Sequence, residues 1–162
     1  MALRNVVKEG DPILRKTCKE VKEVNDHIRM ILDDMLETMR DAQGVGIAAP
    51  QVGILRRMFI AEPSEDELYF VINPVIKLAE GSQTGNEGCL SVPGLVGTVE
   101  RPEHVIMEGL DRDGNPQTID VEGFAAIVLS HEYDHLDGIL YTDKATEVFE
   151  PAADDEEEYE EE

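Results

Sequence analysis

The chain has 162 residues and a formal net charge of −22 at pH 7, with 36 acidic and 14 basic side chains. A domain of this length buries roughly 70% of its unfolded surface, which is enough to fold without disulfides. The negative charge argues against binding a nucleic-acid backbone, because that affinity comes from Lys and Arg side chains.

The two ends of the chain also limit its class. No apolar run reaches the roughly 18 residues that a membrane span needs. The first residues lack the apolar core and cleavage site of a secretory signal, so we expect a cytoplasmic protein without membrane contact. Residues 151–162 contain eight acidic and no basic side chains, which predicts a disordered acidic tail after one domain at residues 1–150.

The first expected element is a helix near the N-terminus. Asn25 is a helix-capping residue type, and the apolar residues after it follow helical spacing to about Arg40, with Gly44 as a stop signal. Residues 58–61 and 68–72 then predict two short strands. Glycine and proline are frequent over residues 44–53 and 81–97, and we assign no helix or strand to those stretches.

A hairpin and a second helix follow. Residues 105–110 and 117–121 predict two strands around the turn Asp113-Gly114. Residues 124–137 predict a helix that ends at Gly138. Together these elements predict an α+β fold with mostly antiparallel sheets around this central helix.

The second helix carries the pentapeptide His131-Glu132-Tyr133-Asp134-His135. Two imidazoles four residues apart share one face of a helix and can reach one metal ion. Glu132 flanks that ion without binding it and can act as a base for a metal-bound water. The chain has four histidines, and two of them lie here, which argues against a chance match on a surface helix.

A catalytic site of this type needs a third protein ligand and an open position for water. The pattern HExxHxxGxxH would place that ligand at Tyr141, which is a poor metal ligand. Glu147 and Glu150 lead into the acidic tail, where a rigid ligand is not expected. Cys89 remains, because a thiolate binds Zn(II) or Fe(II) strongly and the adjacent Gly88 allows close approach of the backbone. Sequence separation leaves its distance from the histidines open.

Three segments together resemble the peptide deformylase family: residues 44–51 (GVGIAAPQ), 87–91 (EGCLS) and 131–135 (HEYDH). They occur in the family's order and at its typical separations, and the resemblance covers about residues 3 to 146. It implies a catalytic domain at residues 1–150 with one divalent metal held by Cys89, His131 and His135, commonly Fe(II), with Zn(II), Ni(II) or Co(II) as alternatives. It also implies removal of the formyl group from the N-terminal formyl-methionine of newly made proteins.

The resemblance further implies a mechanism. Metal-bound hydroxide attacks the formyl carbon, and Glu132 acts first as general base and then as general acid. The side-chain amide of Gln51 and the backbone N–H of Leu90 stabilise the oxyanion, while the backbone of Gly46 positions the substrate. The acidic end of the chain disfavours ribosome association, because many relatives end in a longer basic helix. Ser130 also replaces a usual glutamine, with a modest expected effect.

A substrate pocket is predicted beside the metal. Phe124, Ile127 and Val128 fall on the helical stripe that carries the two histidines, which suits a methionine side chain. Ordinary core packing explains Phe124 and Val128 equally well. The expected opposite wall is Val45, and the substrate-binding residues of the cysteine loop are Glu87 and Gly88. Glu87 can also pair with Arg101 to brace that loop, or both can lie at the surface.

Two other functions share part of this pattern. A zinc endopeptidase would share only HExxH, and Cys89→Ser would then spare metal binding. A degenerate relative kept as a binding module would bind without turnover. The loss of Glu132, Gln51 or a ligand would have favoured the binding module, and all are present.

Overall fold

The computed structural model describes residues 2–151. The predicted acidic tail therefore lies outside the described residues, apart from residue 151. In chain order, the elements are η1 (Pro12–Arg15), α1 (Asp26–Asp41), β1 (Gly46–Ala48), η2 (Ala49–Val52), β2 (Met58–Ser64), β3 (Glu67–Glu80), β4 (Gln83–Cys89), β5 (Val92–Arg101), β6 (His104–Leu110), β7 (Pro116–Glu122), α2 (Phe124–His135), α3 (Tyr141–Lys144) and β8 (Glu147–Phe149). None of these helices is long and apolar enough to cross a membrane.

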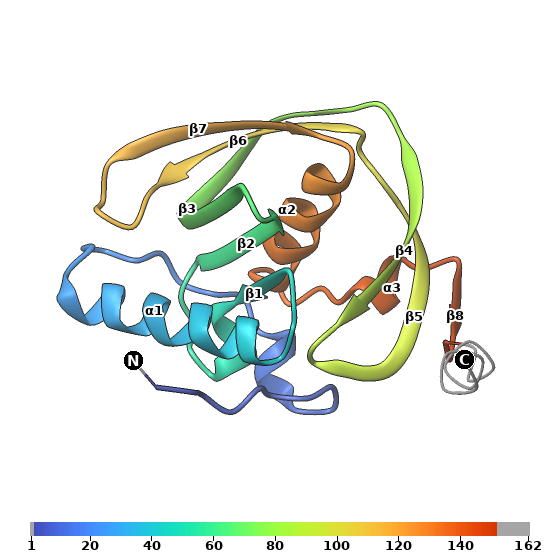
Figure 1. Cartoon of the computed structure of the whole chain (residues 1–162), viewed down its shortest axis with the longest axis horizontal. Helices are drawn as coiled ribbons and strands as arrows, with labels where there is room; N and C mark the ends of the chain where they lie inside the picture. Colours follow the sequence, from blue (N-terminus) through green and yellow to red (C-terminus); the bar gives the residue numbers. More distant parts are fainter. Residues whose placement is uncertain (1, 152–162) are drawn as a thin grey trace.

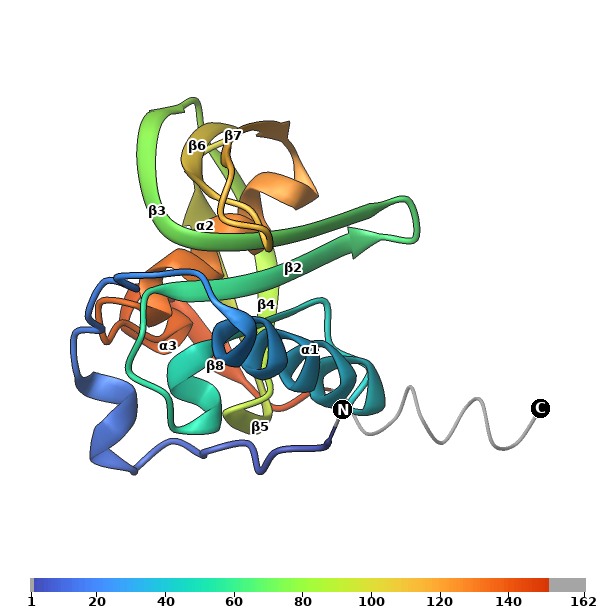
Figure 2. The same ribbon diagram turned by 90° about the vertical axis from the view of Figure 1, so that its left-hand side faces the viewer.

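The strands form two antiparallel sheets. The larger sheet has the order β1-β2-β3-β6-β7, and the smaller has the order β4-β5-β8. Helix α2 lies between the two sheets, while α1 packs on β1 and β2 from the other side (Figure 1). The connected ends of β2 and β3 project beyond the helices (Figure 2). This arrangement confirms the predicted α+β class with mostly antiparallel sheets.

Helix α1 begins where the sequence predicts. The side chain of Asn25 accepts a hydrogen bond from the backbone N–H of Ile28 at 3.0 Å, which satisfies a donor that the first helical turn cannot pair internally. The helix buries an apolar face made of Ile28, Ile31, Leu32, Met35 and Met39. That face packs against Ile47 of β1 and against the strand residues Met58, Ile60 and Ile72. This packing fixes the position of β1 against α1.

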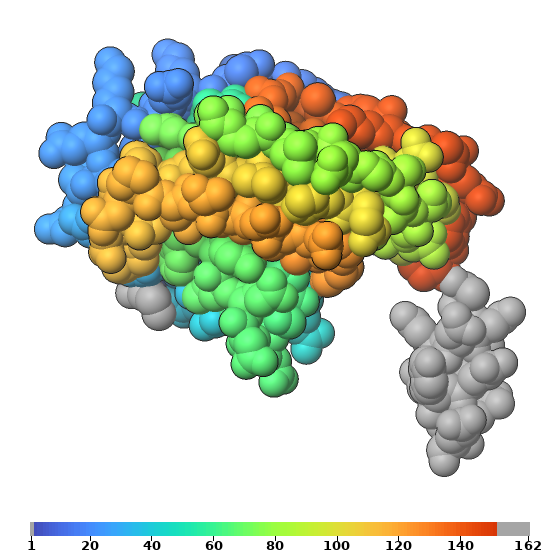
Figure 3. Space-filling model, turned by 90° about the horizontal axis from the view of Figure 1, so that it is seen from above, coloured from blue at the N-terminus to red at the C-terminus, as the bar shows by residue number. Residues whose placement is uncertain are grey.

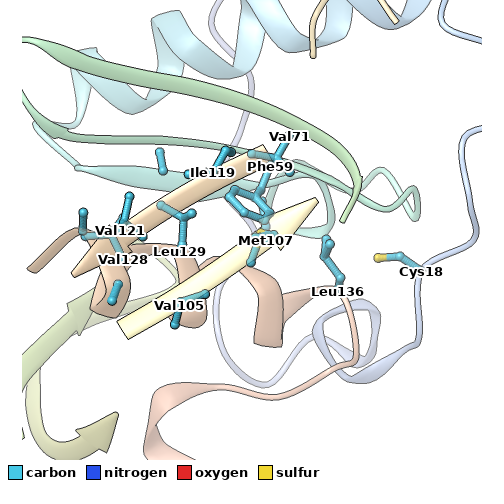
Figure 4. Packing of buried hydrophobic residues seen from close by; sticks show 14 residues of the cluster. Cys18, Phe59, Val71, Val105, Met107, Ile119, Val121, Val128, Leu129 and Leu136 are labelled. Atoms are coloured by element: carbon cyan, nitrogen blue, oxygen red, sulfur yellow. The ribbon is translucent and has the colours of Figure 1, made fainter. Parts of the chain in front are cut away.

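Helix α2 is buried on most of its surface. Its residues Val128 and Leu129 join a core cluster with Phe59, Val71 and Met107 from the large sheet (Figure 4). The helix ends at His135, two residues before the predicted end. Gly138 follows with a φ of 76°, a left-handed conformation that glycine adopts without strain and that turns the chain away.

The glycine-rich stretches are where the sequence prediction is wrong. Residues 46–48, 83–89 and 92–101 form strands, and β4 pairs with β5 from Gln83↔Arg101 to Cys89↔Val92. Backbone pairing to neighbouring strands outweighs the low strand preference of glycine there. The predicted hairpin at Asp113-Gly114 is confirmed, because β6 and β7 pair along their whole length.

The segment after α2 returns to the small sheet. Residues 147–149 form β8, which pairs with residues 96–98 of β5. Figure 3 shows this red segment lying beside the yellow-green strands β4 and β5. Strand β8 therefore forms one edge of the small sheet, with β5 between it and β4.

Candidate metal centre

Three donor atoms, two from the C-terminal half of α2 and one from the end of β4, lie close together. The Nε2 atoms of His131 and His135 lie 3.2 Å apart, and the Sγ of Cys89 lies 3.4 Å from the Nε2 of His135. All three donors lie within 4.8 Å of one another, and among the described residues this is the group found with metal-ligand spacing. The helix places its two imidazoles one turn apart, and the end of β4 brings the thiol to them.

The spacing of these donors fits a tetrahedral metal ion. With a metal–nitrogen bond of about 2.0–2.1 Å and a metal–sulfur bond of about 2.3 Å, tetrahedral geometry puts two nitrogens about 3.3 Å apart and a nitrogen and a sulfur about 3.6 Å apart. The observed distances of 3.2 and 3.4 Å are close to these values. A thiolate with two imidazoles also matches the ligand preference of Zn(II) and Fe(II).

His131 is held in place by a buried acid. Its Nδ1 lies 2.8 Å from the Oε1 of Glu87, so the proton sits on Nδ1 and leaves Nε2 free to face the other donors. Arg101 binds both oxygens of Glu87 at 2.9 Å and also donates to Asp134 at 2.7 Å. The Glu87 and Arg101 side chains are 4% and 2% exposed, so this ion pair is buried and the surface alternative is wrong.

The ionisable groups around the centre are strongly shifted. Burial disfavours the carboxylate of Glu87, but hydrogen bonds from Arg101 and His131 dominate and lower its pKa to about 2. Burial likewise lowers the pKa of His131, but the neighbouring Glu132, Cys89 and Glu87 raise it to about 10. The pKa of His135 falls well below its usual value through burial and the adjacent His131.

Glu132 lies beside the three donors without joining them. Its Oε2 is 3.9 Å from the Nε2 of His131, and its Oε1 is buried without a hydrogen-bond partner among the described residues. Burial raises the pKa of Glu132 to about 7, which suits a group that exchanges protons at neutral pH. A Cβ at Gly46 would lie 2.5 Å from the Oε2 of Glu132, so the absence of a side chain on β1 makes room for this carboxylate.

The amide of Gln51 is fixed beside the thiol of Cys89. Its Oε1 accepts from the backbone N–H of Ala48 at 2.9 Å, while its Nε2 donates to the Oγ of Ser91 at 3.1 Å and to the Sγ of Cys89 at 3.5 Å. Gln51 is 1% exposed. The side chain of Gln51 thus ties the segment at residues 44–51 to the loop that carries Cys89, and its Nε2 lies beside that ligand.

A cleft of about 380 Å³ opens onto the centre. All of the residues predicted for catalysis and substrate binding line this cleft, together with two of the three predicted metal ligands. These residues are Val45, Gly46, Gln51, Glu87, Gly88, Cys89, Leu90, Phe124, Ile127, Val128, His131 and Glu132. Phe124 and Val45 are 53% and 42% exposed at its mouth, whereas Val128 is 4% exposed and also belongs to the core cluster. Val128 therefore belongs to the core and also borders the cleft, and its role in substrate binding stays a prediction.

Several neighbours of the centre were not singled out from the sequence. Gln43 and Asn86 line the cleft, and Ser91 holds the amide of Gln51. Tyr141 stacks on the ring of His131, with centroids 6.0 Å apart and planes at 21°. Ser91 lies inside the EGCLS segment and could have been found there, whereas no sequence signal places Tyr141 against a histidine ten residues away.

Comparison with known proteins gives a consistent result. The sequence profile of the polypeptide deformylase family matches residues 3–150. The peptide deformylase of Symbiobacterium thermophilum is 52% identical over 99% of this chain and 75% of its own length, and that of Lachnoclostridium phytofermentans is 49% identical over 99% and 100%. Crystal structures of the peptide deformylases from Thermotoga maritima and Thermus thermophilus superimpose with TM-scores of 0.88 and 0.84. The Thermotoga protein is 34% identical, and the match covers 91% of this chain and 100% of that protein. The Thermus protein is 43% identical, and the match covers 87% of this chain and 84% of that protein.

Proposed function

The chain belongs to the polypeptide deformylase family, whose members remove N-terminal formyl groups, and from this premise we propose that it is a metal-dependent deformylase acting on the formyl-methionine of newly made proteins. The observation that carries the proposal is the convergence of Cys89, His131 and His135 beside Glu132 at the base of an apolar cleft. The catalytic domain in this proposal is residues 1–150.

The metal would be held by the thiolate of Cys89 and the two imidazole Nε2 atoms. When bound, a divalent ion lowers the pKa of a water molecule and polarises a carbonyl oxygen. We assign Fe(II) as the native ion, with Zn(II), Ni(II) and Co(II) as ions that the same donors accept. Because Fe(II) beside a thiolate is open to oxidation, the iron form should lose activity in air faster than the nickel form.

The protein groups supply proton transfer and charge stabilisation. Glu132 accepts the proton of the attacking water and then delivers it to the leaving amine; its burial and its pKa of about 7 support both roles. The Nε2–H of Gln51 and the backbone N–H of Leu90 stabilise the oxyanion that develops on the formyl oxygen, a contribution of about 2.7–4 kcal/mol per donor in comparable sites. The backbone of Gly46, packed against Glu132, positions the substrate.

The cleft supplies recognition of methionine. Val45, Phe124, Ile127 and Val128 line its apolar side and would surround the flexible thioether chain. Glu87 and Gly88, at the end of β4, border the same space. Nascent formyl-methionyl chains are the proposed partners, which places the activity in the cytoplasm. The net charge of −22 disfavours stable docking on ribosomal RNA.

The proposed activity is tested by formate release from formyl-Met-Ala, with acetyl-Met-Ala as control, on metal-loaded protein prepared without oxygen. Formate from the first peptide alone is the expected result. Cys89→Ser should lose both metal and turnover; a variant that keeps its metal and cleaves internal peptide bonds would instead indicate an endopeptidase. A metal-loaded wild-type protein that releases no formate would contradict the proposal and leave a binding module.

A further inference from the structure

A chain of buried charges runs from the metal ligand His131 to the surface of α3. Glu87 accepts from His131, Arg101 donates to Glu87, and Arg101 also donates to the Oδ2 of Asp134. The Nζ of Lys144 lies 3.0 Å from that same Oδ2. Lys144 is therefore the outermost member of a series of contacts that ends on a metal ligand.

We propose that Lys144 is a positioning residue for His131, acting through Asp134, Arg101 and Glu87; the proposal rests on the proposed function of the metal centre. Lys144 does not line the cleft, so its role is indirect. By holding Asp134, Lys144 fixes how Arg101 divides its hydrogen bonds between Asp134 and Glu87.

Lys144 gives Asp134 a second basic partner beside Arg101. Glu87 and Asp134 are two acids whose side chains are 4% and 12% exposed, and Arg101 is the single buried base between them. Without Lys144, Asp134 would depend on Arg101 alone, and a poorly paired charge in a buried site is costly. Arg101 would then be drawn toward Asp134 and would hold Glu87 less firmly.

The backbone of Lys144 is fixed well enough to do this. Arg15 forms an ion pair with Asp143, and the same Asp143 accepts from the backbone N–H of Leu140 at 3.0 Å. Tyr141, the first residue of α3, is 1% exposed, and its ring stacks on the ring of His131. Helix α3 is thus anchored at Tyr141 and at Asp143, which fixes the backbone from which Lys144 reaches Asp134.

The alternative is an ordinary surface ion pair. The side chain of Lys144 is 44% exposed, and exposed pairs contribute about 0–1 kcal/mol and are screened by salt. Such a pair would change stability slightly and leave the metal site unaltered. Lys77 provides a matched control, because it pairs with Glu108 at 3.7 Å on the large sheet with both side chains about half exposed.

The experiment compares Lys144→Met, Lys144→Arg and Lys77→Met in the full chain loaded with Co(II). We would measure the absorption bands of the cobalt site, the rate of cobalt release to a chelator, kcat and KM for formyl-Met-Ala, and unfolding in urea. Direct partners of metal ligands change affinity or activity about 10- to 100-fold. Lys144 is further from the ligand and half exposed, so we expect Lys144→Met to speed release and lower kcat by about 3- to 10-fold.

The spectrum of Lys144→Met should shift while its KM stays within about twofold, because the residue lies outside the cleft. Lys144→Arg, which keeps the charge, should restore most of the wild-type values, and Lys77→Met should match wild type. A Lys144→Met protein that loses only stability, with unchanged spectrum, release rate and kcat, would overturn the proposal. If wild-type protein releases no formate, the proposed function fails, and the spectrum and release rate still decide the role of Lys144.

Discussion

Substitution of Gly46 by alanine tests how closely β1 and the general base are packed. The new Cβ would lie 2.5 Å from the Oε2 of Glu132, 2.8 Å from its Cδ and 2.9 Å from its Cγ. An ordinary contact is at least 3.4 Å, so the carboxylate oxygen would have to move by about 0.9 Å. Glu132 is 4% exposed and borders the cleft, so the contact would push its carboxylate out of its position in the site.

The size of the effect follows from that displacement. Misplacing a catalytic group by about 1 Å costs about 100-fold in rate, and forcing a methyl group into a packed interior costs about 1–3 kcal/mol in stability. We therefore expect Gly46→Ala to lower kcat about 100-fold and the free energy of unfolding by about 1–3 kcal/mol. Formate release on protein of measured metal content and urea denaturation give the two values.

Two further variants isolate the cause. Gly85→Ala is the control, because a Cβ there meets only the Cδ1 of Ile127, at an ordinary 3.5 Å, and should leave stability unchanged or slightly raised. In a Glu132→Ala background the contact is absent, so Gly46→Ala should cost much less stability than in wild type. Equal losses in the two backgrounds, or wild-type kcat in Gly46→Ala, would refute the reasoning.

Three other perturbations have distinct signatures. Glu132→Gln should keep the metal, as measured by elemental analysis, and lose about 100- to 10,000-fold in turnover; near-native activity would falsify the acid–base role. Arg101→Met should lower the free energy of unfolding in urea by about 3–5 kcal/mol, because it removes the buried guanidinium that Glu87 and Asp134 share; a loss below about 1 kcal/mol would contradict this. Hydrogen bonds with Glu80 and, to a smaller extent, Asp120 raise the pKa of His104. The contribution of His104 to folding stability is therefore fully present below its unfolded pKa of about 6.5, and it is lost as pH rises through the raised value. His104→Gln should therefore lower Tm more at pH 6 than at pH 9, and a pH-independent difference would count against that cluster.

The helical part of the site could be read from the sequence. His131 and His135 are four residues apart, and helical geometry alone puts both imidazoles on one face. The cap at Asn25 and the turn at Asp113-Gly114 are equally local signals, and the structure confirms them. Such predictions succeed because the interacting groups lie within one turn of backbone.

The remaining features depend on contacts between distant segments. Strands β4 and β5 are rich in glycine and were not predicted, because their stability comes from pairing with each other and with β8. The convergence of Cys89 with the histidines was inferred by elimination and resemblance, since 46 residues separate it from His135. The link from Lys144 to Asp134 and Arg101 has no sequence periodicity at all, so only the folded chain reveals it.

The central claim is that one sulfur and two imidazole nitrogens hold the same ion. X-ray absorption spectroscopy of the zinc-loaded protein tests this directly, since zinc–sulfur and zinc–nitrogen bonds differ, at about 2.3 Å and about 2.0–2.1 Å. We expect one sulfur and two imidazole neighbours in wild type, and no zinc retained by Cys89→Ser. A wild-type spectrum with only nitrogen and oxygen neighbours would contradict the account.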